Sequence, residues 1–231
     1  MLREILEAFK TKDELGSLIE EFASMLEMSA EIVREATTVY FGALDATVDR
    51  KSFKAQDVKI NKVERKIRKR ILWRLAGQPD SRDVPTALLL MSLVKDAERI
   101  GDYAKELAVL TTFAGGAAQA DTKALRVIAD EIGEIVDALP KAFRDSDQAA
   151  AAQLVRQGRS LSDRCEEHLQ KLAGGPTVPG LASHLLGTQY YMRTLAHAMN
   201  ILSGLVNPLH KLDYHDEKDM LTEVQLGRDE E

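Results

Sequence analysis

Apolar positions in the first part of the chain recur with a helical period. From residue 18 onward, apolar or small residues follow one another at alternating steps of four and three: Leu18, Phe22, Met25, Ser29, Ile32, Ala36, Val39 and Ala43. This is the spacing of a coiled-coil seam, and over this length it predicts one long helix. No proline precedes Pro79, so nothing in this stretch forces a helix to end.

Two more helices are predicted before the first glycine break. One begins near Ser52 and carries apolar residues on one face, namely Val58, Val63, Ile67, Ile71 and Leu75. It ends at Gly77-Gln78-Pro79-Asp80, which combines a helix stop with a turn. The next helix is predicted over residues 81–113, with Pro85 tolerated in its first turns, and Gly115-Gly116 stops it.

The same plan follows a second time. Helices are predicted over residues 121–140, 147–172 and 181–212, and alternation with a period of two is missing throughout. The pattern therefore predicts an all-α protein made of two tandem antiparallel three-helix bundles. Residues 1–116 form the first predicted bundle, residues 117–213 the second, and residues 214–231 an acidic C-terminal tail.

Composition and charge argue against a nucleic-acid-binding, membrane-spanning or disulfide-bonded protein. The net charge of -6 is concentrated after residue 212, where eight acidic and two basic residues follow, so the remaining body is close to neutral and does not suggest a nucleic-acid binder. No long apolar run predicts a membrane span, and the acidic amphipathic start does not resemble a signal peptide. The single cysteine, Cys165, excludes an intrachain disulfide and fits a reducing cytoplasm.

Carboxylates on two predicted helices form the sharpest chemical feature. Glu98 and Asp102 lie four residues apart, and Asp57, Asn61 and Glu64 make a similar row on the preceding helix. If the two helices pack antiparallel, these rows meet, and the repelling charges then need a proton or a cation between them. Oxygen ligands of this kind suit Mg²⁺, Ca²⁺, Mn²⁺ or ferric iron. Spacing alone favours the other interpretation, a solvent-facing pair of charges, which is common on helices.

Other candidate groups carry weaker signals. The histidines all lie in the second half; His197 is expected to be packed, and the loose cluster His210, Asp213, His215 and Asp216 is expected to be solvated. The Glu-x-x-His and His-Glu-x-x-His motifs are absent, as are phosphate and dinucleotide loops, and Cys165 lies among acidic residues that raise a thiol pKa. The helix beginning near Ser52 is strongly basic, through Lys62, Arg65, Lys66, Arg68, Lys69, Arg70 and Arg74. It could dock an acidic partner, a nucleotide or a membrane surface, or simply face solvent.

The segment Glu98-Arg-Ile-Gly-Asp-Tyr-Ala resembles the signature of the PhoU family of phosphate-uptake regulators. The segment Asp57-Val-Lys-Ile-Asn-Lys-Val-Glu64 is similar to the partner motif on the middle helix of that family. The turn at Gly77-Gln78-Pro79 and the six-helix plan extend the resemblance over essentially the whole chain.

The resemblance implies a metal site and a regulatory role. Family members bind multinuclear metal clusters through these carboxylates, and the corresponding ligands here are Asp57, Asn61, Glu98 and Asp102. Iron is the metal expected first, with zinc, manganese, magnesium or calcium as alternatives. The family acts in the cytoplasm on a phosphate transporter and a sensor histidine kinase, and some relatives accompany sodium–phosphate symporters or other anion permeases.

The sequence also departs from the family pattern. Asn61 stands where the family usually has aspartate, and the second repeat has Met192 and Ala196 in place of the carboxylates. Its middle helix offers only Ser162 and Glu166, with Asp163 and Glu167 beside them. One surviving metal site, in the first repeat, is therefore expected.

We expect a non-enzymatic, metal-binding regulator of phosphate uptake that works by protein contact. It would be peripheral to the membrane at most, would bind no specific nucleic acid, and a homodimer is compatible with this reading. The alternatives are a carboxylate-metal phosphohydrolase and a metal-free adaptor bundle for another anion permease.

Overall fold

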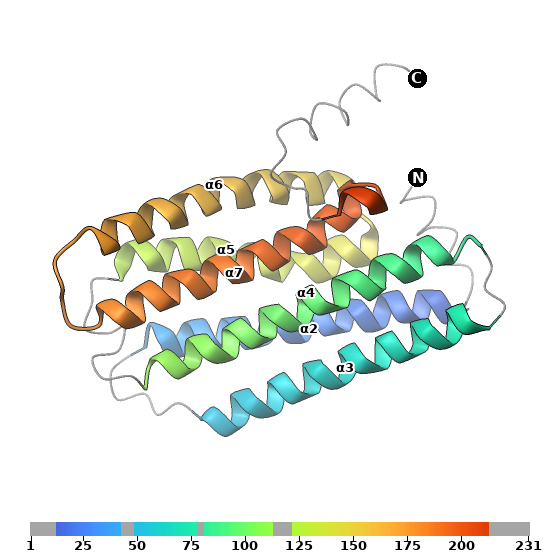
Figure 1. Ribbon diagram of the computed structural model, residues 1–231, viewed down its shortest axis with the longest axis horizontal. Helices are drawn as coiled ribbons and strands as arrows, with labels where there is room; N and C mark the ends of the chain where they lie inside the picture. The colour runs from blue at the N-terminus through green and yellow to red at the C-terminus, as the bar shows by residue number, and fades with distance from the viewer. Residues whose placement is uncertain (1–12, 43–48, 78–80, 113–121, 213–231) are drawn as a thin grey trace, which may run out of the picture.

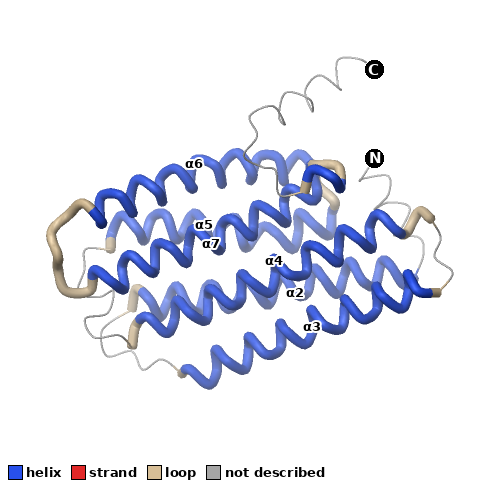
Figure 2. Tube along the Cα trace, viewed as in Figure 1, coloured by secondary structure: helices blue, strands red, loops and turns tan. Residues whose placement is uncertain are grey.

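The computed structural model describes residues 13–42, 49–77, 81–112 and 122–212 (Figure 1). The described part of the chain forms six long helices and one short 3-10 helix, without a strand (Figure 2). They are α2 (Asp13–Tyr40), α3 (Arg50–Ala76), α4 (Val84–Leu110), α5 (Lys123–Asp145), α6 (Gln148–Ala173), α7 (Leu181–Val206) and η2 (Leu209–Lys211). The predicted all-α fold with six antiparallel helices is confirmed.

The helices pack as two adjoining triplets. Helices α2, α3 and α4 contact one another, as do α5, α6 and α7, and the triplets meet where α4 lies against α7 and α2 against α5. Helices α3 and α6 lie at opposite edges of the molecule (Figure 1). Among the described helices, α3 packs mainly against α2 and α4, and many of its other side chains are exposed.

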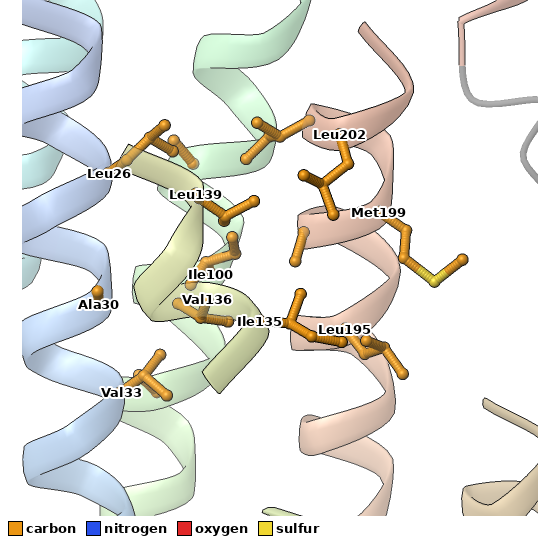
Figure 3. Packing of buried hydrophobic residues seen from close by; sticks show 14 of the residues in the cluster. Leu26, Ala30, Val33, Ile100, Ile135, Val136, Leu139, Leu195, Met199 and Leu202 are labelled. Carbon is orange, nitrogen blue, oxygen red and sulfur yellow. The ribbon is translucent and has the colours of Figure 1, made fainter. Parts of the chain in front are cut away.

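One hydrophobic core runs through both triplets. The predicted seam of α2 is buried from Leu18 to Ala36. Its neighbours Leu26, Ala30 and Val33 belong to one cluster with buried side chains of α4, α5 and α7 (Figure 3). Phe22 of α2 meets Phe143 of α5 edge to face, with ring centroids 4.7 Å apart. The polar member of the seam, Ser29, lies with its hydroxyl 3.0 and 2.9 Å from the carbonyl oxygens of Met25 and Ala97, which satisfies it in the core.

The ends of α5 and α7 differ most from the prediction. The predicted end of α5 at Pro140 is wrong, because the helix continues to Asp145. The residues after the proline explain the continuation: Ala142 and Phe143 are buried in the core, and this burial offsets the backbone hydrogen bond that proline cannot donate. The helix ends instead at Ser146, whose left-handed φ of 54° lets its N–H bond back to the last turn.

Helix α7 ends at Val206 rather than at Leu212, because Pro208 takes an extended conformation and starts the 3-10 turn η2. Helix α4 spans Val84–Leu110, three residues shorter at each end than the predicted 81–113, and Pro85 lies in its first turn as expected. Ala43, Phe113, Asp213 and the tail over residues 214–231, which includes His215 and Asp216, lie outside the described residues. None of the described helices is long and apolar enough to cross a membrane.

Candidate functional site

Helices α3 and α4 approach closely at the predicted carboxylates. Asp49 caps the start of α3 by accepting hydrogen bonds from the backbone N–H groups of the first turn. Gly101 of α4 lies directly over Ile60 of α3, and a Cβ at this glycine would come 2.8 Å from the Ile60 Cδ1 atom. The missing side chain therefore lets the helices lie close, which brings Asp57 and Asp102 to the same point of the seam.

A lysine joins these two carboxylates. The Lys105 ammonium Nζ lies 3.4 Å from Asp57 Oδ2 and 3.0 Å from Asp102 Oδ1. Arg99 adds a second cation on Asp102, with Nη1 3.1 Å from Oδ2. We refer to Asp57, Lys105 and Asp102 as the carboxylate–lysine cluster.

The close contacts in the cluster change the pKa values of its three side chains. Burial, together with the neighbouring Asp102, raises the pKa of Asp57 above its ordinary value, although Lys105 opposes the shift. Burial alone would raise the pKa of Asp102 as well, but the hydrogen bond and charge of Lys105 lower it. Burial disfavours the Lys105 ammonium, yet the two aspartates raise the pKa of Lys105 above its usual range. Lys105 is therefore charged at neutral pH and is the counter-ion of the pair.

The remaining predicted residues are held by other partners. Glu98 is 7% exposed, and its Oε2 atom lies 2.6 Å from Lys95 Nζ and 3.9 Å from Arg99 Nε. Glu64 is 8% exposed and pairs with Arg68 at 3.4 Å. Asn61 is half-buried, and its backbone carbonyl accepts a hydrogen bond from Arg65 Nε at 3.0 Å.

These pairings bear on the predicted metal. Within the described ranges, no group of three or more His, Cys, Asp or Glu side chains is arranged to hold a metal ion. Each predicted carboxylate already has a lysine or arginine partner, so the arrangement does not fit a multinuclear cluster. A single cation could bind between Asp57 and Asp102 only after displacing Lys105. The metal at Asp57, Asn61, Glu98 and Asp102 stays a prediction.

A cavity of about 260 Å³ opens beside the cluster. Its lining combines a basic and apolar wall with two carboxylates: Arg50, Phe53, Lys54, Asp57, Lys105, Glu106, Ala108 and Val109. The carboxylate–lysine cluster is therefore reached from solvent through this opening.

A different polar group lies at the seam between α4 of the first triplet and α7 of the second. Asp96 Oδ1 lies 2.8 Å from His197 Nδ1 and accepts a hydrogen bond from Asn200 Nδ2 at 2.9 Å. The His197 ring stacks on Tyr103. The prediction of a packed His197 is confirmed. Residues Ser162, Asp163, Glu166 and Glu167 of α6 belong to no metal-ligand group in the part of the chain that is described.

The cysteine thiol and a pair of histidines are two further groups with side chains that can act in catalysis or bind a metal. Burial raises the pKa of the Cys165 thiol to about 11, so the thiol stays protonated at neutral pH and is a poor nucleophile. His168 and His184 face each other with their Nε2 atoms 2.9 Å apart, at the junction of α6 and α7.

Lys105 and Asp96 are the residues that sequence reasoning missed. Lys105 lies three positions after Asp102 on one helix, so the pairing was readable from the spacing. The partners of Asp96 lie about a hundred residues further along the chain, and no local pattern indicates them.

Comparisons with known proteins agree with the fold. Residues 22–111 match the PhoU domain family. The crystal structure of PhoU from Pseudomonas aeruginosa superimposes with a TM-score of 0.75 at 20% identity, covering 87% of this chain and 99% of that one. The phosphate transport system regulatory protein PhoU from Streptococcus pneumoniae gives 0.71 at 19% identity, covering 84% of this chain and 93% of that one.

A curated relative is also similar in sequence. An uncharacterized protein of Deinococcus radiodurans is 26% identical over 157 residues, which are 68% of this chain and 56% of that protein. The match thus spans little more than half of the relative's length.

Proposed function

This chain is a PhoU-domain protein, and we propose from that premise that it regulates phosphate uptake by contact with a membrane transport complex. The proposed partners are a phosphate transporter or anion permease and a sensor histidine kinase, reached from the cytoplasm. The observation that carries the proposal is the agreement of the domain match over residues 22–111 with the folds of two PhoU proteins.

The shape of the molecule supports a regulator that works by contact. Its helices bury one continuous core, and its cavity beside the carboxylate–lysine cluster is small. Asp57, Glu64, Glu98 and Asp102 each lie within ion-pair distance of a lysine or arginine, which leaves no free general base among these four carboxylates. No described feature favours the phosphohydrolase alternative, and a phosphatase screen with several divalent cations should give no turnover.

The test is a phosphate-uptake assay in cells of the source organism. We take the proposed regulation to be inhibition of the transporter when phosphate is abundant. Under these conditions, cells that lack the gene should take up labelled phosphate faster than the parent strain. Re-expression of the intact chain should restore the parental rate. Identical uptake in both strains, at high and low phosphate, would rule the proposal out.

Partner capture separates the proposed regulator from a metal-free adaptor for another permease. The tagged chain, cross-linked in cells grown with abundant phosphate, should retain subunits of a phosphate transporter. Retention of a permease for a different anion would identify the adaptor instead.

A further inference from the structure

The outer side of α3 is basic along its whole length. The helix carries eleven basic residues, Arg50, Lys51, Lys54, Lys59, Lys62, Arg65, Lys66, Arg68, Lys69, Arg70 and Arg74. Its two acidic residues, Asp57 and Glu64, are the two that turn inward and are buried. The charge that faces solvent on this helix is therefore of one sign.

Most of these cations have no carboxylate partner in the described ranges. Lys51, Lys54, Lys59, Lys62 and Lys69 are exposed, and no described Asp or Glu lies within ion-pair distance of them. Lys66 and Arg70 share Glu21 of α2, which neutralises one charge there. Arg68 and Arg74 are also paired, with Glu64 and Asp83. The five exposed lysines therefore concentrate positive charge on one side of α3, and such a concentration attracts an anionic surface.

Exposed apolar side chains lie at the end of the same side. Lys62, Lys66, Lys69 and Trp73 follow one another at helical spacing, so they lie on one face. Trp73 is 72% exposed and Leu72 59% exposed, which is unusual for side chains of this size. A hollow of about 350 Å³ beside them is lined by Leu18, Lys66, Lys69, Arg70, Trp73 and Arg74.

We propose that this basic face of α3 (Lys51, Lys54, Lys59, Lys62, Arg65, Lys66 and Lys69, with Leu72 and Trp73) docks on a membrane surface of anionic phospholipids. The cations meet lipid phosphates, and the hollow beside Trp73 receives one headgroup. Trp73 and Leu72 enter the interface, where amphipathic aromatic rings are favoured. This proposal does not depend on the regulation of phosphate uptake.

The geometry favours a membrane over an acidic polypeptide. Helix α3 has 27 residues and is about 40 Å long, and it lies at the edge of the bundle with no described helix over its outer side (Figure 1). Its cations are spread along this length, and the two hollows beside it are small. A flat anionic surface meets all of them together, whereas an acidic segment needs a groove to hold it.

Trp73 makes the test direct, because it is the only tryptophan of the chain. The full-length protein is mixed at 0.1 M salt with vesicles of phosphatidylcholine alone or with added phosphatidylglycerol. The emission maximum of Trp73 should shift to the blue, and the protein should sediment, only with the anionic vesicles. Raising the salt to 0.5 M should release it, because screening shortens the reach of the charges.

Matched variants locate the binding face. The triple change Lys59→Gln, Lys62→Gln and Lys69→Gln removes three exposed cations and should weaken vesicle binding on the order of a hundredfold. The control triple Lys141→Gln, Arg156→Gln and Lys171→Gln makes the same change in net charge on α5 and α6, and should bind within about twofold of the parent chain. Trp73→Ala should weaken sedimentation with anionic vesicles while leaving its salt dependence in place.

Several outcomes would overturn the proposal. One is an unshifted Trp73 emission with anionic vesicles at 0.1 M salt. Another is equal weakening by both triple variants, which would mean that net charge alone drives the association. Tight binding of a polyglutamate peptide that depends on Lys59, Lys62 and Lys69, without vesicle binding, would assign the face to an acidic protein instead. Surface changes of this kind leave folding nearly unaffected, and thermal melting of each variant verifies it.

Discussion

At the scale of single residues, Lys105 decides the chemistry of the site. Two carboxylates that face each other across a helix seam need a proton, a metal or a basic side chain. Here the ammonium of Lys105 lies within ion-pair distance of both Asp57 and Asp102. The basic side chain thus fills the role that the sequence motif assigns to a cation.

Replacing Lys105 by methionine should destabilise the protein by roughly 1–3 kcal/mol at pH 7, because two partly buried carboxylates lose their shared partner. Urea unfolding measures this change. The exposed pair of Lys141 with Asp145 provides the control, and Lys141→Met should leave the unfolding midpoint where it is.

The same variant should show a distinct pH dependence. The pKa of Asp57 is already raised, and the loss of Lys105 raises it further. An acid whose pKa is raised on folding loses stabilising free energy as the pH rises from its ordinary value through its folded one. The loss of unfolding free energy in Lys105→Met should therefore be largest at pH 7 and should become smaller as the pH falls toward 4. A deficit that is constant over this range would mean that lost packing, not charge, is responsible.

Metal binding can be tested in the same pair of proteins. Because Lys105 occupies the position between the carboxylates, added Mn²⁺ or Mg²⁺ should change the melting temperature of the parent chain little and should raise that of Lys105→Met. If the parent chain is itself stabilised, and Asp102→Asn removes the effect, then a metal displaces Lys105 and the metal site predicted from the sequence is real.

At the scale of helices, local sequence signals predict most helix ends, and tertiary contacts between helices explain the exceptions. Helical period and stop signals were enough to predict six helices and most of their ends, since both depend on neighbours in sequence. Pro140 shows where this reasoning fails. Local sterics at a proline predict a helix end. Here the helix continues to Asp145, because Phe143 is buried against Phe22 in a tertiary contact.

Glycine at position 187 is predicted to matter for the contact between α2 and α7. A Cβ there would lie 2.2 Å from the Tyr40 hydroxyl, which is held by its hydrogen bond to the Ser183 carbonyl. Gly187→Ala should therefore cost about 1–3 kcal/mol in unfolding free energy.

Gly133 of α5 gives the matched control, because a Cβ added there meets nothing within 4 Å. Gly133→Ala should stabilise the protein by about 0.4–1 kcal/mol through the higher helix propensity of alanine. Equal effects of the two changes would contradict the role assigned to the Tyr40 contact.

At the scale of the whole molecule, the two triplets share one core. Side chains of α2, α4, α5 and α7 interleave in a single cluster (Figure 3), and Asp96 of the first triplet holds His197 and Asn200 of the second. Neither triplet would keep its apolar surface covered if the other unfolded.

The two triplets should therefore unfold together. Trp73 reports on the first triplet alone, and far-ultraviolet circular dichroism reports on all helices. Both signals should follow one urea transition with the same midpoint. A Trp73 transition that precedes the loss of helix would show two independent bundles, with boundaries near those predicted from the repeat.

The sequence alone establishes the helical class, the order of the helices and the two carboxylate rows, because periodicity and spacing are local properties of the chain. It also placed the basic side chains on α3 and the apolar seam on α2. Three features become visible only in the folded structure: Lys105 lies between Asp57 and Asp102, Asp96 pairs with His197, and Trp73 faces outward. Each of these depends on how closely two helices approach and on which face the core leaves uncovered, and packing sets both only once every helix is in place.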